Sequence, residues 1–141
     1  MDVARFEKRC SPLKKMNKHL VFVYGTLRQG GVRAMPELFV EAKFVGRGKV
    51  RGRLYDLGEY PCLLVDEAGS LVLGEVYEID DEILQQLDEI EATADYQRQR
   101  TEVALDGQSM TCWVYAPEGE AYPRRRLINS GDWIEYAKTK I

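Results

Sequence analysis

Residues 81–91 place a carboxylate where an apolar side chain is expected. The four apolar residues of this segment share one face at 3.6 residues per turn, which predicts an amphipathic helix (Ile83, Leu84, Leu87 and Ile90). The other acidic residues fall outside that face, whereas Glu91 projects between Leu84 and Leu87. Partial burial and the negative end of the helix dipole both disfavour a charged carboxylate, so we expect a raised pKa for Glu91. Such a carboxyl is suited to general-base chemistry near neutral pH.

Two structural interpretations of Glu91 also fit the pattern. The predicted helix ends at this residue, so the side chain can leave the apolar face and reach water. It can also pair with Arg98 or Arg100 in the strand that follows. An ion pair with Arg98 would lower the pKa of Glu91 and work against a role as base.

A second candidate is the segment Tyr24-Gly25-Thr26-Leu27-Arg28, which directly follows the first predicted strand. Gly25 allows the chain to turn sharply. Successive backbone N–H groups in such a turn can point into one concavity and hold a carboxylate or an oxyanion. Thr26 adds a hydroxyl donor. A glycine after a strand is common, so this segment alone favours an ordinary strand-end turn.

The strands that position these segments are predicted from apolar runs and turn signals. Residues 19–24 form a continuous apolar run rich in β-formers, which predicts a buried central strand. Residues 96–105 and 109–116 are expected to form a hairpin around Asp106-Gly107. The remaining strands are expected at 43–57, 61–65 and 71–79.

Helices are expected at three places. A short helix within 30–42 should turn Met35, Leu38 and Phe39 inward, and Pro36 fits its first turn. Asp80 can cap the helix that carries Glu91, and a last helix is expected from Asp132.

The long strand 43–57 indicates how the sheet closes. Its glycines, Gly46, Gly48 and Gly52, are typical of bulges or tight bends such as barrel corners. Five or six strands in mostly hairpin order, with helices inserted and no alternating βαβ pattern, predict an α+β domain: a small, mixed β-barrel flanked by helices.

Composition bounds the class of protein. The chain has 141 residues, of which 45% are hydrophobic and 30% charged, as in one ordinary globular domain. We expect a flexible basic extension at 1–17 and the folded domain at 18–141. The net charge of −3 argues against nucleic-acid binding, and Arg124-Arg125-Arg126 is interpreted as a solvated edge. No apolar run approaches the ~20 residues that span a bilayer, so no membrane association is expected.

The cysteines and the histidine argue against disulfides and metal. Cys10, Cys62 and Cys112 are odd in number and widely spaced, which favours reduced thiols in the cytoplasm, with Cys62 and Cys112 in the core. His19 is the single histidine and there are no paired cysteines, so no metal site is expected.

Taken together, these residues resemble the gamma-glutamylcyclotransferase-like proteins, the group that includes gamma-glutamylamine cyclotransferase and the AIG2-like proteins. The opening signature of that family is similar to residues 21–28. Its catalytic segment is similar to residues 87–91 followed by Tyr96-Gln97-Arg98. Further matches follow in the family's order, namely 52–56 with Tyr60-Pro61, 74–77, 114–115 and 130–133.

The resemblance implies a fold, a reaction and roles for residues. It implies a small β-barrel flanked by helices with a cavity at the barrel mouth, where Glu91 is the catalytic acid/base. Tyr24, Gly25, Thr26 and Leu27 would bind the glutamyl group through their backbone. The reaction would convert a small gamma-glutamyl substrate to 5-oxoproline and an amine, with no cofactor. Tyr60, Tyr96 and Arg98 are further candidates for the cavity wall. Alternatively, the two tyrosines pack in the core, and Arg98 is a structural partner of Asp88 or Glu91.

One departure leaves the leaving group undefined. Some amine-acting members of the family carry an Asn-His pair shortly after the loop, whereas this chain has Gly31-Val32-Arg33-Ala34-Met35 there. Two alternatives to an enzyme are a non-catalytic small-molecule binding module of the AIG2-like type and an interaction protein that uses the barrel surface. The sequence does not define the oligomeric state.

Overall fold

The computed structural model describes residues 17–117 and 126–140. Except for its last residue, the predicted basic extension at 1–17 lies outside the described residues, and so do Cys10, Arg124 and Arg125.

The described part of the chain forms seven strands and three helices. The strands are β1 Lys18–Val23, β2 Lys43–Asp56, β3 Pro61–Val65, β4 Ser70–Asp80, β5 Tyr96–Leu105, β6 Gln108–Pro117 and β7 Arg126–Leu127. The helices are α2 Met35–Leu38, α3 Asp81–Ala92 and α4 Trp133–Lys138. The predicted elements are all present, and the short β7 was not predicted.

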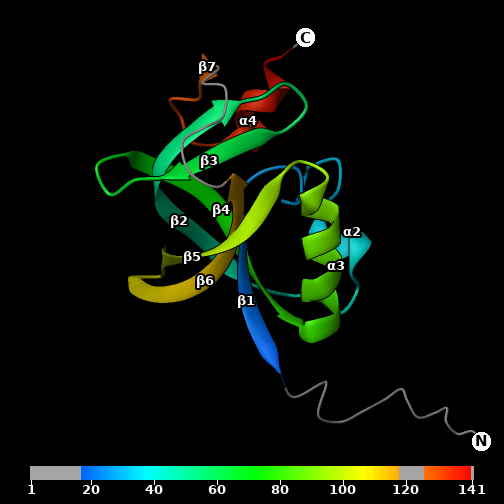
Figure 1. Ribbon diagram of the computed structural model, residues 1–141. Helices are drawn as coiled ribbons and strands as arrows, with labels where there is room; N and C mark the ends of the chain where they lie inside the picture. Colours follow the sequence, from blue (N-terminus) through cyan, green and yellow to red (C-terminus); the bar gives the residue numbers. More distant parts are fainter. Residues whose placement is uncertain (1–16, 118–125, 141) are drawn as a thin grey trace, which may run out of the picture.

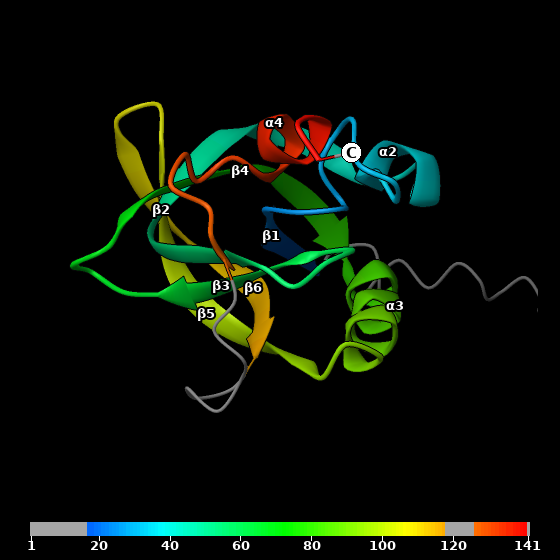
Figure 2. The ribbon, with the colours of Figure 1, turned by 90° about the horizontal axis from the view of Figure 1, so that it is seen from above.

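Five of the strands close a mixed barrel, which confirms the predicted fold class (Figure 1). The strand order is β2-β4-β1-β6-β5, and pairing of β2 with β5 closes the ring. The β1–β6 pair is parallel, and the other barrel pairs are antiparallel. Strands β3 and β7 pair with the far end of β2 and extend the sheet beyond the barrel. Figures 1 and 2 both show α2 and α3 on one side of the barrel, whereas α4 lies nearer the end where β3 and β7 extend the sheet.

The glycines of β2 allow the closure, as the sequence predicts. The pairing of β2 with β4 shifts register between Phe44 and Gly46, which is a bulge. A Cβ atom on Gly48 would lie 2.6 Å from Cγ1 of Val103 on β5. The bare backbone of β2 therefore lets the two strands approach each other closely.

Strand β1 is buried on both faces because it separates two apolar clusters. Val21 and Val23 contact the cluster beneath α3, which contains Leu84 and Leu87. Phe22 and Tyr24 point into the barrel interior with Val76, Val103 and Val114. Alternate residues of a strand face opposite sides, so a strand covered on both sides reads as a continuous apolar run. Cys62 and Cys112 are both buried in the core, as expected.

The expected inward position of Leu38 is wrong. Met35 and Phe39 are buried, but the side chain of Leu38 is 42% exposed. Helix α2 is four residues long and ends in Phe39 with an extended backbone, φ −135° and ψ 95°. The change from helical to extended geometry turns Phe39 toward the core and leaves Leu38 facing solvent.

Candidate active site

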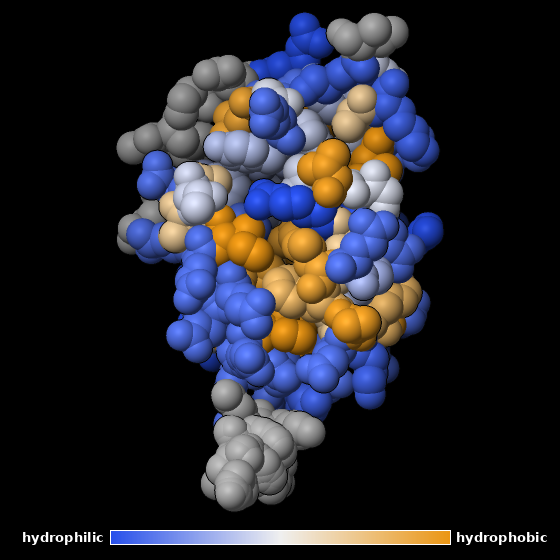
Figure 3. Space-filling view, turned by 90° about the vertical axis from the view of Figure 1, so that its right-hand side faces the viewer, coloured by the Kyte–Doolittle hydropathy of each residue, from blue (hydrophilic) through white to orange (hydrophobic). Residues whose placement is uncertain are grey.

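A cavity beside the end of β1 brings the two sequence candidates together. Its volume is about 440 Å³, including the part open to solvent. Every predicted site residue lines it, namely Tyr24, Gly25, Thr26, Leu27 and Glu91, and so do Tyr60 and Tyr96. Figure 3 shows the side of the molecule that carries α2 and α3, where apolar residues gather within a hydrophilic surface and hydrophilic atoms lie among them.

Glu91 reaches the cavity from the last turn of α3. The carboxylate of Asp80 caps the start of this helix by accepting a hydrogen bond from the N–H of Ile83 at 2.9 Å, as predicted. Ile83, Leu84 and Leu87 of the same helix are buried. The helical period then carries Glu91 onto the edge of this apolar face.

The carboxylate of Glu91 is half-buried and carries an unusual proton affinity. Burial raises the pKa of Glu91 from 4.5 to about 7, and the positive charge of Arg33 opposes this rise. Within the described residues, the Glu91 carboxylate has no hydrogen-bond donor and no cation at ion-pair distance. It is therefore a half-buried acid whose charge no neighbour in the described part of the chain neutralises by an ion pair.

The alternative that Glu91 pairs with Arg98 or Arg100 is wrong for the described structure. The Nε atom of Arg98 lies 3.0 Å from Oδ1 of Asp88, which also accepts a hydrogen bond from the hydroxyl of Tyr115. The guanidinium groups of Arg98 and Arg100 both stack on the ring of Trp113, at 4.5 Å and 4.3 Å from its centroid. Arg98 therefore does not line the cavity, which corrects that expectation, and its pairing with Asp88 leaves Glu91 unneutralised.

A tight turn after α3 builds the wall next to Glu91. The N–H of Ala94 donates to the carbonyl of Glu91 at 3.0 Å, and Asp95 adopts a left-handed backbone with φ 62°. This turn leads into Tyr96, whose hydroxyl donates to the carbonyl of Pro61 at 2.8 Å. The ring of Tyr60 meets that of Tyr96 edge-on at 5.9 Å. An aromatic wall is thus fixed beside the carboxylate.

The loop after β1 forms the opposite wall, and Gly25 is required there. A Cβ atom at this position would lie 2.7 Å from Cγ of Pro61, which also lines the cavity. The hydroxyl of Tyr24 donates to the carbonyl of Tyr115 at 2.8 Å and accepts from the N–H of Leu63 at 3.3 Å. Because this hydroxyl is engaged inside the barrel, Tyr24 offers the cavity its backbone and ring.

The loop carbonyls accept hydrogen bonds within the protein, whereas the loop N–H groups have no acceptor among the described residues. The carbonyls of Gly25, Thr26 and Leu27 accept hydrogen bonds of 2.8 to 3.0 Å from the N–H groups of residues that follow them, Arg28, Arg33 and Met35. No described group accepts a hydrogen bond from the N–H of Gly25, Thr26 or Leu27, or contacts the hydroxyl of Thr26 at bonding distance. Consecutive N–H groups without an internal acceptor are suited to bind an anion.

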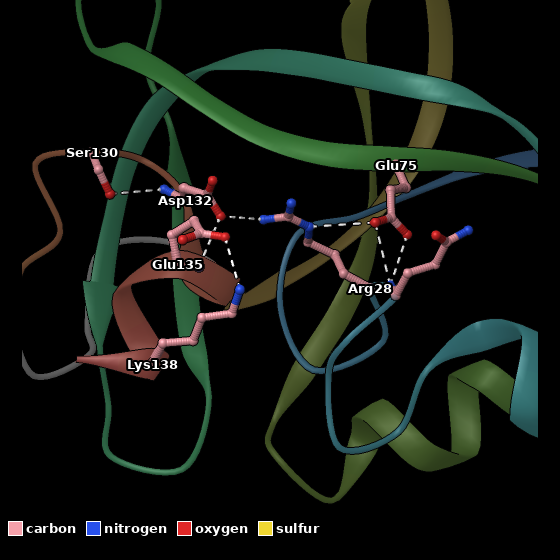
Figure 4. A network of polar contacts seen from close by, with 7 residues as sticks. Arg28, Glu75, Ser130, Asp132, Glu135 and Lys138 are labelled. Atoms are coloured by element: carbon pink, nitrogen blue, oxygen red, sulfur yellow. Dashed lines mark hydrogen bonds and ion pairs between the residues drawn. The ribbon is translucent and has the colours of Figure 1, made fainter. Parts of the chain in front are cut away.

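A buried polar network fixes the far end of this loop (Figure 4). Nη1 of Arg28 lies 2.9 Å from Oδ1 of Asp132, the residue that caps α4, and Nε of Arg28 lies 3.6 Å from Oε2 of Glu75. Glu75, which is only 4% exposed, accepts from the N–H of Gln29 at 3.0 Å and from the hydroxyl of Tyr77 at 2.9 Å. The network ties the loop to β4 and α4 at once.

Sequence reasoning missed several residues that line the cavity, among them Arg33, Pro61 and Tyr115. Arg33 lines the cavity, although the sequence marked it solely as part of a departure from the family's Asn-His pair. Pro61 and Tyr115 also line it, from β3 and β6. The position of Arg33 five residues after the signature loop was the available signal. Tyr115 and Pro61 are brought in by strand pairing. Both belong to segments that match the family's pattern, 114–115 and Tyr60-Pro61, and that match was the available signal.

No helix in the described ranges is both long and apolar enough to cross a bilayer. No group of three or more metal-ligating side chains occurs within residues 17–117 and 126–140.

Known proteins match the chain over most of its length. A family model described as gamma-glutamyl cyclotransferase, AIG2-like, matches residues 21–135. A Vibrio cholerae protein to which gamma-glutamylcyclotransferase activity is ascribed is 37% identical over 121 residues, which cover 84% of this chain and 97% of that protein. The gamma-glutamylaminecyclotransferase of Bos taurus is 38% identical over 109 residues, or 67% of this chain and 63% of that enzyme.

The fold has solved counterparts as well. The crystal structure of an AIG2-like protein from Mus musculus superposes with a TM-score of 0.64 at 32% identity, covering 74% of this chain and 80% of that one. The similarity therefore extends from the sequence motifs to the arrangement of the barrel.

Proposed function

Because the chain belongs to the AIG2-like gamma-glutamyl cyclotransferase family, we propose that it converts a small gamma-glutamyl compound to 5-oxoproline and a free amine. The observation that carries this proposal is the cavity in which a half-buried, unneutralised Glu91 faces a loop with free N–H groups. Such a site offers a base and an anion cradle to one small molecule.

The reaction is internal to the substrate. The α-amino nitrogen attacks the side-chain carbonyl carbon, a new C–N bond closes the five-membered ring, and the original amide C–N bond breaks. Both reacting groups belong to one molecule, so the main task of the cavity is to fold the substrate into attack geometry. The aromatic wall of Tyr60 and Tyr96 suits that task because its rings are held by each other and by Pro61.

Glu91 moves the proton that this reaction requires. The substrate's α-amino group is protonated at neutral pH and has no lone pair for attack. With a pKa near 7, Glu91 is partly ionised at neutral pH and takes that proton from the α-amino group before the attack. It then donates this proton to the departing nitrogen, and the ring nitrogen releases its second proton to the Glu91 carboxylate, so that the lactam keeps a single N–H. The net change is one bond formed, one bond broken and no redox step, so the mechanism calls for neither a metal nor an organic cofactor.

The loop binds the negative charge of the substrate. The N–H groups of Gly25, Thr26 and Leu27 would hold the glutamyl carboxylate or the oxyanion that develops during attack. The network of Arg28, Glu75 and Asp132 keeps these groups in place. We propose that this chemistry takes place in the domain at 18–141 and in the cytoplasm, where reduced cysteines are stable.

The test measures 5-oxoproline release from a panel of gamma-glutamyl compounds that includes gamma-glutamyl-lysine and gamma-glutamyl-alanine. Glu91→Gln keeps the size of the side chain and removes the base, so kcat should fall at least ~100-fold. Glu89→Gln, a change at an exposed carboxylate of the same helix, is the matched control and should leave kcat unchanged. Full activity in Glu91→Gln would exclude Glu91 as the base.

A second candidate function is a binding module that keeps the pocket without the chemistry. The free N–H groups of the loop favour it as much as they favour an enzyme. Tight binding of 5-oxoproline together with no turnover of any panel compound would establish the binding module. The raised pKa of Glu91 is the feature that distinguishes the enzyme, because binding an anion gains nothing from a nearby carboxylate.

A further inference from the structure

Arg33 is a charged residue of the cavity wall that the proposed reaction leaves without a role. Among the described residues that line the cavity, Glu91 has the one carboxyl group and Arg33 the one guanidinium, which is fully charged at neutral pH. The side chain of Arg33 is exposed, and no described carboxylate lies at ion-pair distance from its guanidinium. Its backbone is fixed, because its N–H donates to the carbonyl of Thr26 at 2.9 Å. An anchored backbone thus presents an unengaged cation at the rim of the cavity.

The positive charge of Arg33 does not help Glu91 to act as a base. The charge of Arg33 lowers the pKa of Glu91 and so opposes the effect of burial on the same group. A lower pKa makes a carboxylate a weaker proton acceptor. Any benefit of Arg33 to the reaction must therefore come from a negative charge on the substrate.

The place of Arg33 decides which negative charge it meets. The glutamyl carboxylate is common to all gamma-glutamyl substrates, and the loop N–H groups are available for it among buried residues such as Tyr24 and Leu27. The leaving group has to point to the open side of the cavity, where it departs into water. Arg33 stands at that open side, because it both lines the cavity and is exposed.

We propose that Arg33 binds a carboxylate on the leaving group and makes gamma-glutamyl amino acids better substrates than the gamma-glutamyl derivatives of amines that lack a carboxylate. The inference rests on the proposed cyclotransferase function and adds a specificity-determining residue to it. A guanidinium suits this role because its planar fork holds a carboxylate by two parallel hydrogen bonds.

The test uses two substrates that differ in this one group. Gamma-glutamyl-alanine carries the carboxylate, and gamma-glutamylethylamide is the same molecule without it. The wild type should prefer gamma-glutamyl-alanine in kcat/KM. Arg33→Gln should lower kcat/KM for gamma-glutamyl-alanine about tenfold, mainly through KM, and change that for gamma-glutamylethylamide less than about twofold. Arg33→Lys should retain part of the preference, because it keeps the charge and loses the fork.

Two controls separate this role from others. Arg51→Gln removes the same charge from an exposed position on β2 that does not line the cavity. This variant should leave kcat/KM unchanged for both substrates. Unchanged melting temperatures would show that the variants are folded. An equal loss on both substrates in Arg33→Gln would overturn the proposal, because it would assign Arg33 to the glutamyl carboxylate that the two substrates share.

Failure of the proposed function would look different. If the wild type turns over neither compound, calorimetric binding of the same pair still tests Arg33. Tighter binding of gamma-glutamyl-alanine that disappears in Arg33→Gln would support the proposal. Equal binding of the two compounds by the wild type would overturn it.

Discussion

Replacing Glu91 by glutamine should make the protein more stable above pH 7 while removing its activity. A native carboxyl with a pKa of about 7 keeps its proton up to that pH, whereas the same carboxyl in the unfolded chain loses it near pH 4.5. Between these two values the native state binds more protons than the unfolded state. The free energy of unfolding therefore falls as the pH rises from about 4.5 to 7 and stays reduced above it. Glutamine has no proton to lose and avoids this loss.

The magnitude follows from the two pKa values. Moving the pKa of a carboxyl from 4.5 to about 7 corresponds to roughly 3 kcal/mol of native-state destabilisation once the group is ionised. Glu91 is half-buried and keeps some contact with water, which reduces the expected value to about 2 kcal/mol. The difference between Glu91→Gln and wild type should be smallest near pH 4 and reach about 2 kcal/mol by pH 8.

The measurement is urea unfolding of both proteins across that pH range. Comparing their free energies of unfolding cancels every titration that they share, so the pH-dependent part belongs to Glu91. Glu89→Gln serves as the control, because this exposed carboxylate of the same helix should give a flat difference. A flat difference for Glu91→Gln as well would refute the reasoning. It would mean that the native carboxyl ionises as it does in water.

Three further predictions concern the loop. Gly25→Ala should cost about 1–3 kcal/mol in urea unfolding and lower kcat/KM more than about tenfold, because the new methyl group collides with Pro61; unchanged kinetics would show that the wall moves freely. Tyr24→Phe should cost about 1–2 kcal/mol, because it removes an internal hydroxyl, while kcat/KM stays within a few-fold; a large kinetic loss would assign the hydroxyl to catalysis. Arg28→Gln should destabilise by about 2–3 kcal/mol and exceed the effect of Asp132→Asn, because it leaves a buried carboxylate uncompensated; equal effects measured by urea unfolding would contradict this.

Local sequence chemistry predicted the elements that carry the site. The apolar stripe of α3 and the cap at Asp80 defined the helix and placed Glu91 at its inner edge. The hairpin signal Asp106-Gly107 is confirmed by left-handed backbones at both residues, with φ 52° and 78°. Each of these features depends on residues a few positions apart, so the sequence shows it directly.

Contacts between distant segments were beyond local patterns. Arg28 and Asp132 are 104 residues apart and meet at 2.9 Å only because the barrel places α4 beside the loop. Whether Arg98 pairs with Asp88 or Glu91 depends on which of these two side chains of α3 points toward β5. In the structure it is Asp88 that pairs with Arg98. Strand β7 has two residues, which is too short for an alternating pattern of apolar and polar side chains to appear in the sequence. Its pairing with β2 depends on the arrangement of the whole sheet.

The absence of a described partner for Glu91 is itself an argument for function. Arg98 and Arg100 follow in the next strand, yet both stack on Trp113, and Arg98 also pairs with Asp88. A carboxylate that contributed to stability would gain from an ion pair with such an arginine. An apolar or amide side chain at this position of α3 would avoid the free-energy cost of removing a charged carboxylate from water. What the unpaired arrangement does provide is a carboxyl group with a pKa near neutral pH beside a cavity. Active sites keep groups of this kind at the expense of stability, so the stabilising effect expected for Glu91→Gln and its loss of turnover have the same physical cause.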